Sequence, residues 1–135
     1  MLTVNALRSA GVPSRQVYAP KWSHCDDNHA WVEIWNDGEW YFLGACEPLP
    51  ILNKGWFTNA SSRAMMVHSR WFDQAESGEE KIGTDGMVTM LNELSRYAAV
   101  TEFSVKVEDE EGRPVSGAEV SFQVLNYAEF SPVAE

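Results

Sequence analysis

The most constraining feature of the sequence is a pair of alternating apolar segments joined by a short polar turn. Residues 30–35 (Ala-Trp-Val-Glu-Ile-Trp) and 39–45 (Glu-Trp-Tyr-Phe-Leu-Gly-Ala) flank the tripeptide Asn-Asp-Gly at 36–38. Aromatic and β-branched segments on either side of an Asp-Gly pair are typical of a β-hairpin. The sequence therefore predicts two antiparallel strands over 30–35 and 39–45.

Two registers of this hairpin are compatible with the turn residues. With a two-residue turn, His29 lies opposite Cys46, and each face mixes apolar with charged residues. With a three-residue loop, Trp35 pairs with Glu39, and one face is wholly apolar; its members are Ala30, Val32, Ile34, Trp40, Phe42, Gly44 and Cys46. Because strand alternation separates core from solvent, we predict the three-residue loop, with Cys46 directed into the core.

In the predicted register, His29 and Glu47 project from the same face of neighbouring strands, about one diagonal apart. Diagonal neighbours lie roughly 7–8 Å apart, a gap that long side chains bridge. A carboxylate at that position can accept a proton from one ring nitrogen and fix the imidazole tautomer. This pair is the base and the orienting acid of a nucleophilic triad, so His29 and Glu47 are the predicted catalytic residues.

The remaining elements are shorter. Residues 2–10 have helical composition with one apolar stripe, and Gly11-Val12-Pro13 ends the helix. Further strands are predicted at 15–19 and 65–71. From Phe103 onward, two alternating segments around Phe103–Val107 and Val120–Val124 flank a turn at 110–114, which predicts a hairpin from a β-sandwich.

Charge divides the chain. Residues 1–72 carry six acidic and six basic groups, whereas 73–111 carry eleven acidic groups against Lys81, Arg96 and Lys106; the formal net charge is −10. Five of the six tryptophans lie between Trp22 and Trp56. The acidic stretch is interpreted as a solvated surface that connects two units. An acidic chain lacks the basic patch that nucleic-acid binding needs, and no apolar segment approaches the ~20 residues of a membrane helix.

The hairpin resembles the transglutaminase-like superfamily, papain-like thiol enzymes with a Cys-His-Asp triad. The resemblance rests on His29-Ala30-Trp31-Val32-Glu33, on Gly38-Glu39-Trp40, and on Glu47-Pro48 closing the second strand. It extends to the preceding Gly11-Val12-Pro13-Ser14-Arg15 step, and covers about residues 2–70. It implies thiol-dependent acyl transfer, either amide hydrolysis or transamidation, on a protein or peptide substrate, without a cofactor.

Two departures modify that implication. Glu47 stands where the family usually has Asp, which lengthens the reach by one methylene. In the family the cysteine lies at the start of the helix, and no cysteine precedes Cys25 here. We therefore expect the nucleophile to fall just before Met1 and the chain as given to be an inactive fragment of a thiol enzyme. The resemblance also suggests export from a bacterium, to the periplasm or cell surface.

The C-terminal part resembles immunoglobulin-like or carboxypeptidase-regulatory-like repeats of bacterial proteins. The similarity lies in Val107-Glu108-Asp109 and in the segment 111–120, Glu-Gly-Arg-Pro-Val-Ser-Gly-Ala-Glu-Val. The predicted fold is α+β and mostly antiparallel. It comprises the C-terminal part of a transglutaminase-like core over 1–72, an acidic connection over 73–100, and a partial β-sandwich over 101–135.

Several alternatives remain open. Cys25 or Cys46 could be the nucleophile, the latter in the two-residue register. His24, Cys25, Asp26 and His29 could be read as metal ligands, but they lack a second pair at zinc-like spacing, so no metal site is predicted. The tryptophans could form an aromatic platform. The chain would then be a non-catalytic peptide- or carbohydrate-binding module with an aromatic cleft.

Overall fold

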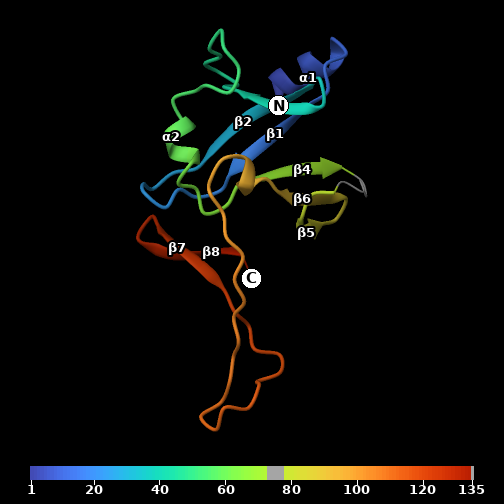
Figure 1. Ribbon diagram of the computed structural model, residues 1–135. Helices are drawn as coiled ribbons and strands as arrows, with labels where there is room; N and C mark the ends of the chain where they lie inside the picture. The colour runs from blue at the N-terminus through green and yellow to red at the C-terminus, as the bar shows by residue number, and fades with distance from the viewer. Residues whose placement is uncertain (73–77, 135) are drawn as a thin grey trace.

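The computed structural model describes residues 1–72 and 78–134 (Figure 1). Six strands form one antiparallel sheet in the order β3-β2-β1-β4-β6-β5, and β7 and β8 form a second sheet of two strands. The strands are β1 (Ser14–Ala19), β2 (His29–Asn36), β3 (Glu39–Leu43), β4 (His68–Phe72), β5 (Lys81–Asp85), β6 (Val88–Asn92), β7 (Phe122–Asn126) and β8 (Glu129–Ala134). The predicted α+β, mostly antiparallel class is confirmed.

Helices are few and short. α1 spans Leu2–Ser9, as predicted to within one residue, and α2 spans Thr58–Ser61; a 3-10 turn, η1, spans Leu94–Arg96. Gly11 follows α1 with φ +79°, a left-handed conformation that suits glycine and turns the chain into β1. None of the helices in the described ranges is long and apolar enough to cross a membrane.

The hairpin register differs from the prediction. Asn36 pairs with Glu39 and Trp35 with Trp40, so the turn has two residues, Asp37 and Gly38, with φ +48° and +88°. Two positive φ angles characterise the type I′ turn that matches strand twist. The predicted three-residue loop is therefore wrong, and the wholly apolar face does not form.

Burial of a charged residue explains the error. Successive strand residues alternate between faces, so His29, Trp31, Glu33 and Trp35 share one face of β2. Glu33 is only 1% exposed, and it lies opposite Arg15 of β1, which is 2% exposed. The face that mixes apolar with charged residues is thus a covered one. A prediction from the alternation of apolar and polar residues assigns the wrong face to the core when buried charged residues, here Arg15 and Glu33, pair with each other.

The orientation predicted for Cys46 is also wrong. β3 ends at Leu43, and Cys46 lies beyond it, exposed and free. Gly44 is buried in the bend that follows, where a Cβ would lie 2.9 Å from the carbonyl oxygen of Glu47. The chain therefore leaves the sheet before Cys46, and the pairing of His29 with Cys46 is not part of the ladder.

A compact core lies on the face of β2 that carries Trp31. It is formed by Val17, Ala19, Trp22, Trp31, Phe57, Ala60, Ala64 and Val67, with Phe42, Leu94 and Tyr97 packed against it. These residues come from β1 and the loop after it, from β2 and β3, from the segment around α2, and from η1 and the residue after it. The core therefore holds the start of β2, and with it His29, against the α2 segment.

Beyond residue 77 the chain does more than connect. β6 pairs with β4 and β5 pairs with β6, so this acidic range completes the six-stranded sheet. The chain then leaves the sheet as the extended orange segment of Figure 1, where a bridge joins Glu108 to Pro114. The red β7 comes back to the body, and Asn126 donates to the carbonyl oxygens of Trp22 and Cys25. The hairpin predicted between 103–107 and 120–124 is replaced by β7–β8, so the expected β-sandwich is not confirmed.

Candidate functional site

His29 is the first residue of β2 and pairs with Ala19 of β1. Its ring lies among three aromatic side chains, with centroid separations of 4.6 Å to Trp56, 4.9 Å to Phe57 and 5.8 Å to Trp31. Trp31 and Phe57 are fully buried, whereas Trp56 is 62% exposed. The imidazole is therefore half-buried at the edge of the core, packed on fixed rings and open on one side.

The surroundings of His29 favour the neutral imidazole. Burial against the aromatic rings lowers the pKa of His29, and the negative charges of Asp27 and Glu47 act in the opposite direction. Desolvation penalises the charged imidazolium, and its effect on the pKa of His29 exceeds that of the two carboxylates. A neutral imidazole at pH 7 can accept a proton, which is the property a general base requires.

Glu47 acts on His29 through space. Its charge raises the pKa of His29, yet the two side chains form no hydrogen bond or ion pair within the described part of the chain. The same-face diagonal that the three-residue loop implied for His29 and Glu47 does not form, because the register differs and β3 ends at Leu43. Glu47 acts on His29 only through its charge, and its role as an orienting acid stays a prediction. Asp27, two residues before His29, contributes more strongly and was missed at the sequence level.

We expect the pKa of His29 to be below 6.5, and to fall further in Asp27→Asn and in Glu47→Gln. Each substitution removes a negative charge that favours the imidazolium, while burial is unchanged. Titration of the ring proton signals by NMR measures all three values. Glu129→Gln, on β8, is the matched control and leaves the value unchanged. A higher pKa in either test variant would contradict the electrostatic description.

Both cysteines are free and exposed to solvent. Cys25 belongs to the exposed loop between β1 and β2, where its carbonyl oxygen accepts a hydrogen bond from Asn126 of β7. Cys46 follows β3. Residues 2–9, which form α1, include no cysteine. Across 1–72 and 78–134, no group of three or more His, Cys, Asp or Glu side chains is arranged to hold a metal ion.

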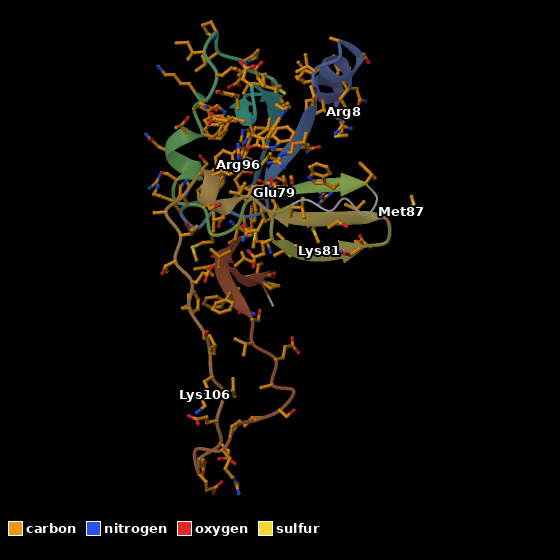
Figure 2. The ribbon with its side chains drawn as sticks, turned by 45° about the vertical axis from the view of Figure 1, so that its right-hand side comes forward. Arg8, Glu79, Lys81, Met87, Arg96 and Lys106 are labelled. Carbon is orange, nitrogen blue, oxygen red and sulfur yellow. The ribbon has the colours of Figure 1, made fainter. Side chains whose placement is uncertain are left out.

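The sequence did not predict a buried ion cluster on the same face of β2. Arg15 donates to Glu33 at 2.6 Å, to Glu93 at 2.7 Å and to Glu79 at 3.2 Å. Arg96 donates to Glu33 at 3.1 Å. Figure 2 shows Glu79 and Arg96 near the middle of the molecule, far from the exposed Lys106. We call these five residues the Arg15 cluster.

A chain of hydrogen bonds links the Arg15 cluster to the ring beside His29. The Tyr97 hydroxyl donates to Glu33 at 2.5 Å and accepts from the Trp31 indole N–H at 2.8 Å. Trp31 in turn stacks on His29. The cluster therefore fixes Trp31, which forms one wall of the histidine site. Opposed charges at 15 and 33 were a signal for it in the sequence, but their partners lie more than 45 residues away.

Comparison with known protein families gives a match to the N-terminal third of the chain. Residues 1–45 match the family model described as the transglutaminase-like superfamily. The range includes α1, β1, β2, β3 and His29, and ends before Glu47. It supports the superfamily resemblance for this third of the chain. No curated protein and no solved structure matches the chain.

Proposed function

We propose that this chain carries the general base of a transglutaminase-like thiol enzyme, with His29 as the base and Glu47 as the acid that orients it. The observation that carries the proposal is the placement of His29 at the start of β2, inside the range that matches the superfamily. There it packs against three aromatic rings that keep the imidazole neutral. The reaction class is acyl transfer from a carboxamide or peptide bond.

The chemistry follows from the base. His29 accepts the proton of a cysteine thiol as the sulfur attacks the carbonyl carbon, giving a tetrahedral intermediate. The imidazolium returns that proton to the departing nitrogen, which leaves as ammonia or an amine while an acyl-thioester remains. Water or a second amine then attacks the thioester with the same base, so hydrolysis and transamidation differ in the final acceptor. Glu47 would orient the ring and stabilise the imidazolium through the negative charge that already acts on His29.

The proposal assigns the thiol to a residue ahead of Met1. In the superfamily pattern the cysteine lies at the start of the helix that precedes the first strand, and α1 occupies that place here. In the parts of the chain that the structure describes, Cys25 and Cys46 are solvent-exposed loop residues, and neither lies at the start of α1, α2 or η1. A thiolate is favoured where a helix N-terminus or a cation stabilises it. Positioned this way, the chain supplies the base but not the nucleophile.

The test uses the longest reading frame that contains this sequence, assayed for ammonia release and amine incorporation with a glutamine peptide, and for peptide hydrolysis. His29→Ala is expected to lower kcat/KM by at least about 100-fold, the usual contribution of a general base. His24→Ala, in the neighbouring loop, is the matched control and keeps the wild-type rate. Retained activity in His29→Ala would overturn the proposal.

The thiol is identified in the same assay by cysteine substitution. Cys25→Ala and Cys46→Ala are expected to retain activity, whereas a cysteine ahead of Met1 is expected to be essential. Loss of activity in either exposed-cysteine variant would overturn the assignment of the thiol. Absence of all activity in the intact protein would overturn the enzyme proposal and favour the alternative, a non-catalytic peptide- or carbohydrate-binding module.

A further inference from the structure

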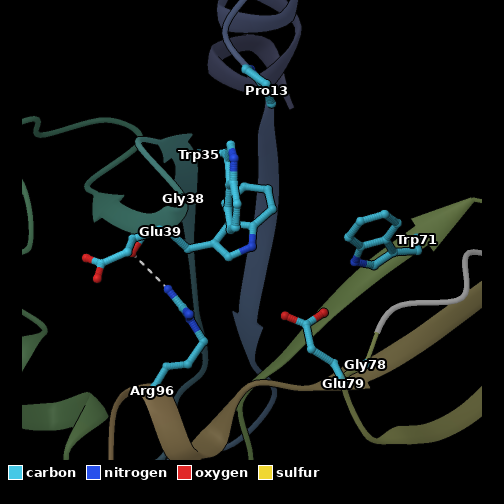
Figure 3. Close-up of a pocket in the computed structure, with 9 residues that line it drawn as sticks. Pro13, Trp35, Gly38, Glu39, Trp71, Gly78, Glu79 and Arg96 are labelled. Atoms are coloured by element: carbon cyan, nitrogen blue, oxygen red, sulfur yellow. Dashed lines mark hydrogen bonds between the residues drawn. The ribbon is translucent and has the colours of Figure 1, made fainter.

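A second concave site lies at the opposite end of β2 from His29. A cavity of about 850 Å³ opens beside the β2–β3 turn, and the described residues that line it include Trp35, Trp40, Trp71, Glu39, Glu79 and Arg96 (Figure 3). His29 and Trp35 lie on the same face of β2, six residues apart, which corresponds to about 20 Å. The cavity is therefore separate from the proposed catalytic site.

Aromatic rings form two sides of the cavity. Trp35 is 41% exposed, and its ring meets Trp40 edge-to-face with centroids 5.2 Å apart. Trp71, from β4, lies on the other side in Figure 3. Its indole N–H donates to the Ser69 hydroxyl of the same strand at 3.2 Å. An exposed tryptophan of this kind offers a π face to a ligand. Both walls belong to sheet strands, so their positions are fixed without a ligand.

One cation already uses an aromatic face at this site. The guanidinium carbon of Arg15 lies 4.1 Å from the centre of the Trp40 ring. Tryptophan is the best aromatic partner for a cation, and the attraction increases when water is excluded. Trp35 and Trp71 have no comparable cation over their rings in the described part of the chain. The cavity thus offers further faces of the kind that Trp40 already presents to Arg15.

The charges around the cavity favour a cation over an anion. The Arg15 cluster holds three carboxylates against two guanidinium groups. The side chain of Glu79 is 28% exposed, and in Figure 3 its carboxylate points into the space between the tryptophan walls. Glu39 adds a further negative charge at the rim, although its carboxylate turns outward in this view. Burial raises the pKa of Glu93 to about 7, so the cluster itself is close to balanced at neutral pH. The negative charge that faces the cavity is that of Glu79, with Glu39 at the rim.

Neutral sugars match the site less well because its polar groups are already engaged. Arg96 donates to Glu33 and to the carbonyl oxygen of Trp40, at 3.1 and 2.8 Å. Glu79 accepts from Arg15 through both carboxylate oxygens at 3.2 Å. A sugar hydroxyl finds few free donors or acceptors here, whereas a cation also gains Coulomb attraction to the Glu79 carboxylate and a cation–π contact with the indole faces.

We propose that this cavity binds an organic cation, a guanidinium or ammonium group on an alkyl chain, between Trp35 and Trp71 and beside Glu79. The source is either the side chain of an arginine or lysine in a peptide or a free amine. Its binding does not depend on the proposed acyl transfer, because the cation would lie too far from His29 to react there.

The test is an NMR titration that follows the indole N–H signals, with Trp71 assigned from Trp71→Phe. N-acetyl-arginine amide and N-acetyl-lysine amide represent the peptide source, and spermidine represents the free amine. The isosteric neutral probe is N-acetyl-citrulline amide, and maltotriose represents a sugar. We expect saturable shifts at Trp35 and Trp71 with the cations, with citrulline at least about threefold weaker.

Two variants and a matched control complete the test. Trp71→Ala and Glu79→Gln are each expected to weaken cation binding by about three- to tenfold. Trp56→Ala, which removes an exposed tryptophan beside His29, leaves it unchanged. Tighter binding of the peptide amides than of spermidine would identify a peptide as the source, and the reverse would identify a free amine. Equal binding of the citrulline probe, preference for maltotriose, or absence of saturable shifts with the cations would overturn the proposal.

Discussion

Replacement of Arg15 by methionine is expected to lower the free energy of unfolding by about 3–5 kcal/mol. The guanidinium of Arg15 is buried and bonds three carboxylates, of which those of Glu33 and Glu93 have side chains 1% exposed. Methionine fills much of the same volume but leaves these carboxylates buried without their main partner. Urea unfolding at pH 8 measures the loss of stability. At this pH the folded variant must either keep the carboxylates charged without Arg15 or bind protons from a solution that holds few of them.

Arg113→Met is the matched control for that prediction. Arg113 bonds Asp109 at 2.7 Å, but its side chain is 71% exposed. Exposed ion pairs contribute about 0–1 kcal/mol, so this variant is expected to stay within about 1 kcal/mol of the wild type. If Arg15→Met destabilises the protein no more than Arg113→Met does, the Arg15 cluster does not hold the sheet together as described.

The second large effect is a fall in stability as the pH rises through neutrality. Burial raises the pKa of Glu93 to about 7, against the opposing effects of the Ser69 hydrogen bond and of Arg15. The folded protein therefore binds a proton more tightly than the unfolded chain, whose carboxyl titrates near 4.5. The stabilisation is complete below about pH 4.5 and is lost as the pH rises to about 7, a change of about 3 kcal/mol.

Glu93→Gln isolates this effect because glutamine resembles the protonated carboxyl at every pH. The variant is expected to match the wild type at pH 5 and to exceed its stability by up to about 3 kcal/mol at pH 8. The difference between the two curves cancels the contributions of His29 and His68, whose lowered pKa values act in the opposite direction. Glu129→Gln keeps the wild-type curve. A difference that does not change with pH would show that Glu93 does not titrate in this range.

The parts of the fold predicted from the sequence are those that depend on near neighbours. α1 was located because an apolar stripe ends at Gly11, and β2 and β3 because their alternation surrounds an Asp-Gly pair. His29 was singled out by the His-Ala-Trp-Val-Glu sequence and by a pairing with Glu47 in a register that is wrong; the structure places it at the start of β2. Each of these features can be recognised from the residues close to it in the sequence.

The register of the hairpin could not be obtained in the same way. It depends on burial of Glu33, which depends on Arg15, Arg96 and Tyr97. Arg96 ends η1 and Tyr97 follows it directly, more than 60 residues from Glu33, in a range interpreted as a solvated connection. Without that knowledge, a charged residue in a strand is assigned to the solvent face. This assignment shifted the predicted pairing of β2 with β3 by one residue and placed Cys46 in the core.

The C-terminal prediction failed for a related reason. Phe103, Val105 and Val107 alternate with polar residues as strands do, but alternation shows only that a segment suits a sheet. Pairing requires a partner in register, and the described chain instead joins β7 to β8 through a turn at Tyr127 and Ala128, both at positive φ. Neither of these two residues is Gly or Asn, the residue types by which such a turn is recognised in a sequence.

The most direct measurement of the central proposal is the pH profile of kcat/KM for acyl transfer in the longest reading frame, compared between the wild type and Glu47→Gln. If His29 is the base and Glu47 its acid, the acid limb lies below pH 6.5. In the variant it shifts to lower pH while the plateau falls. An acid limb that stays in place in Glu47→Gln, or a profile that survives His29→Ala, would contradict the account.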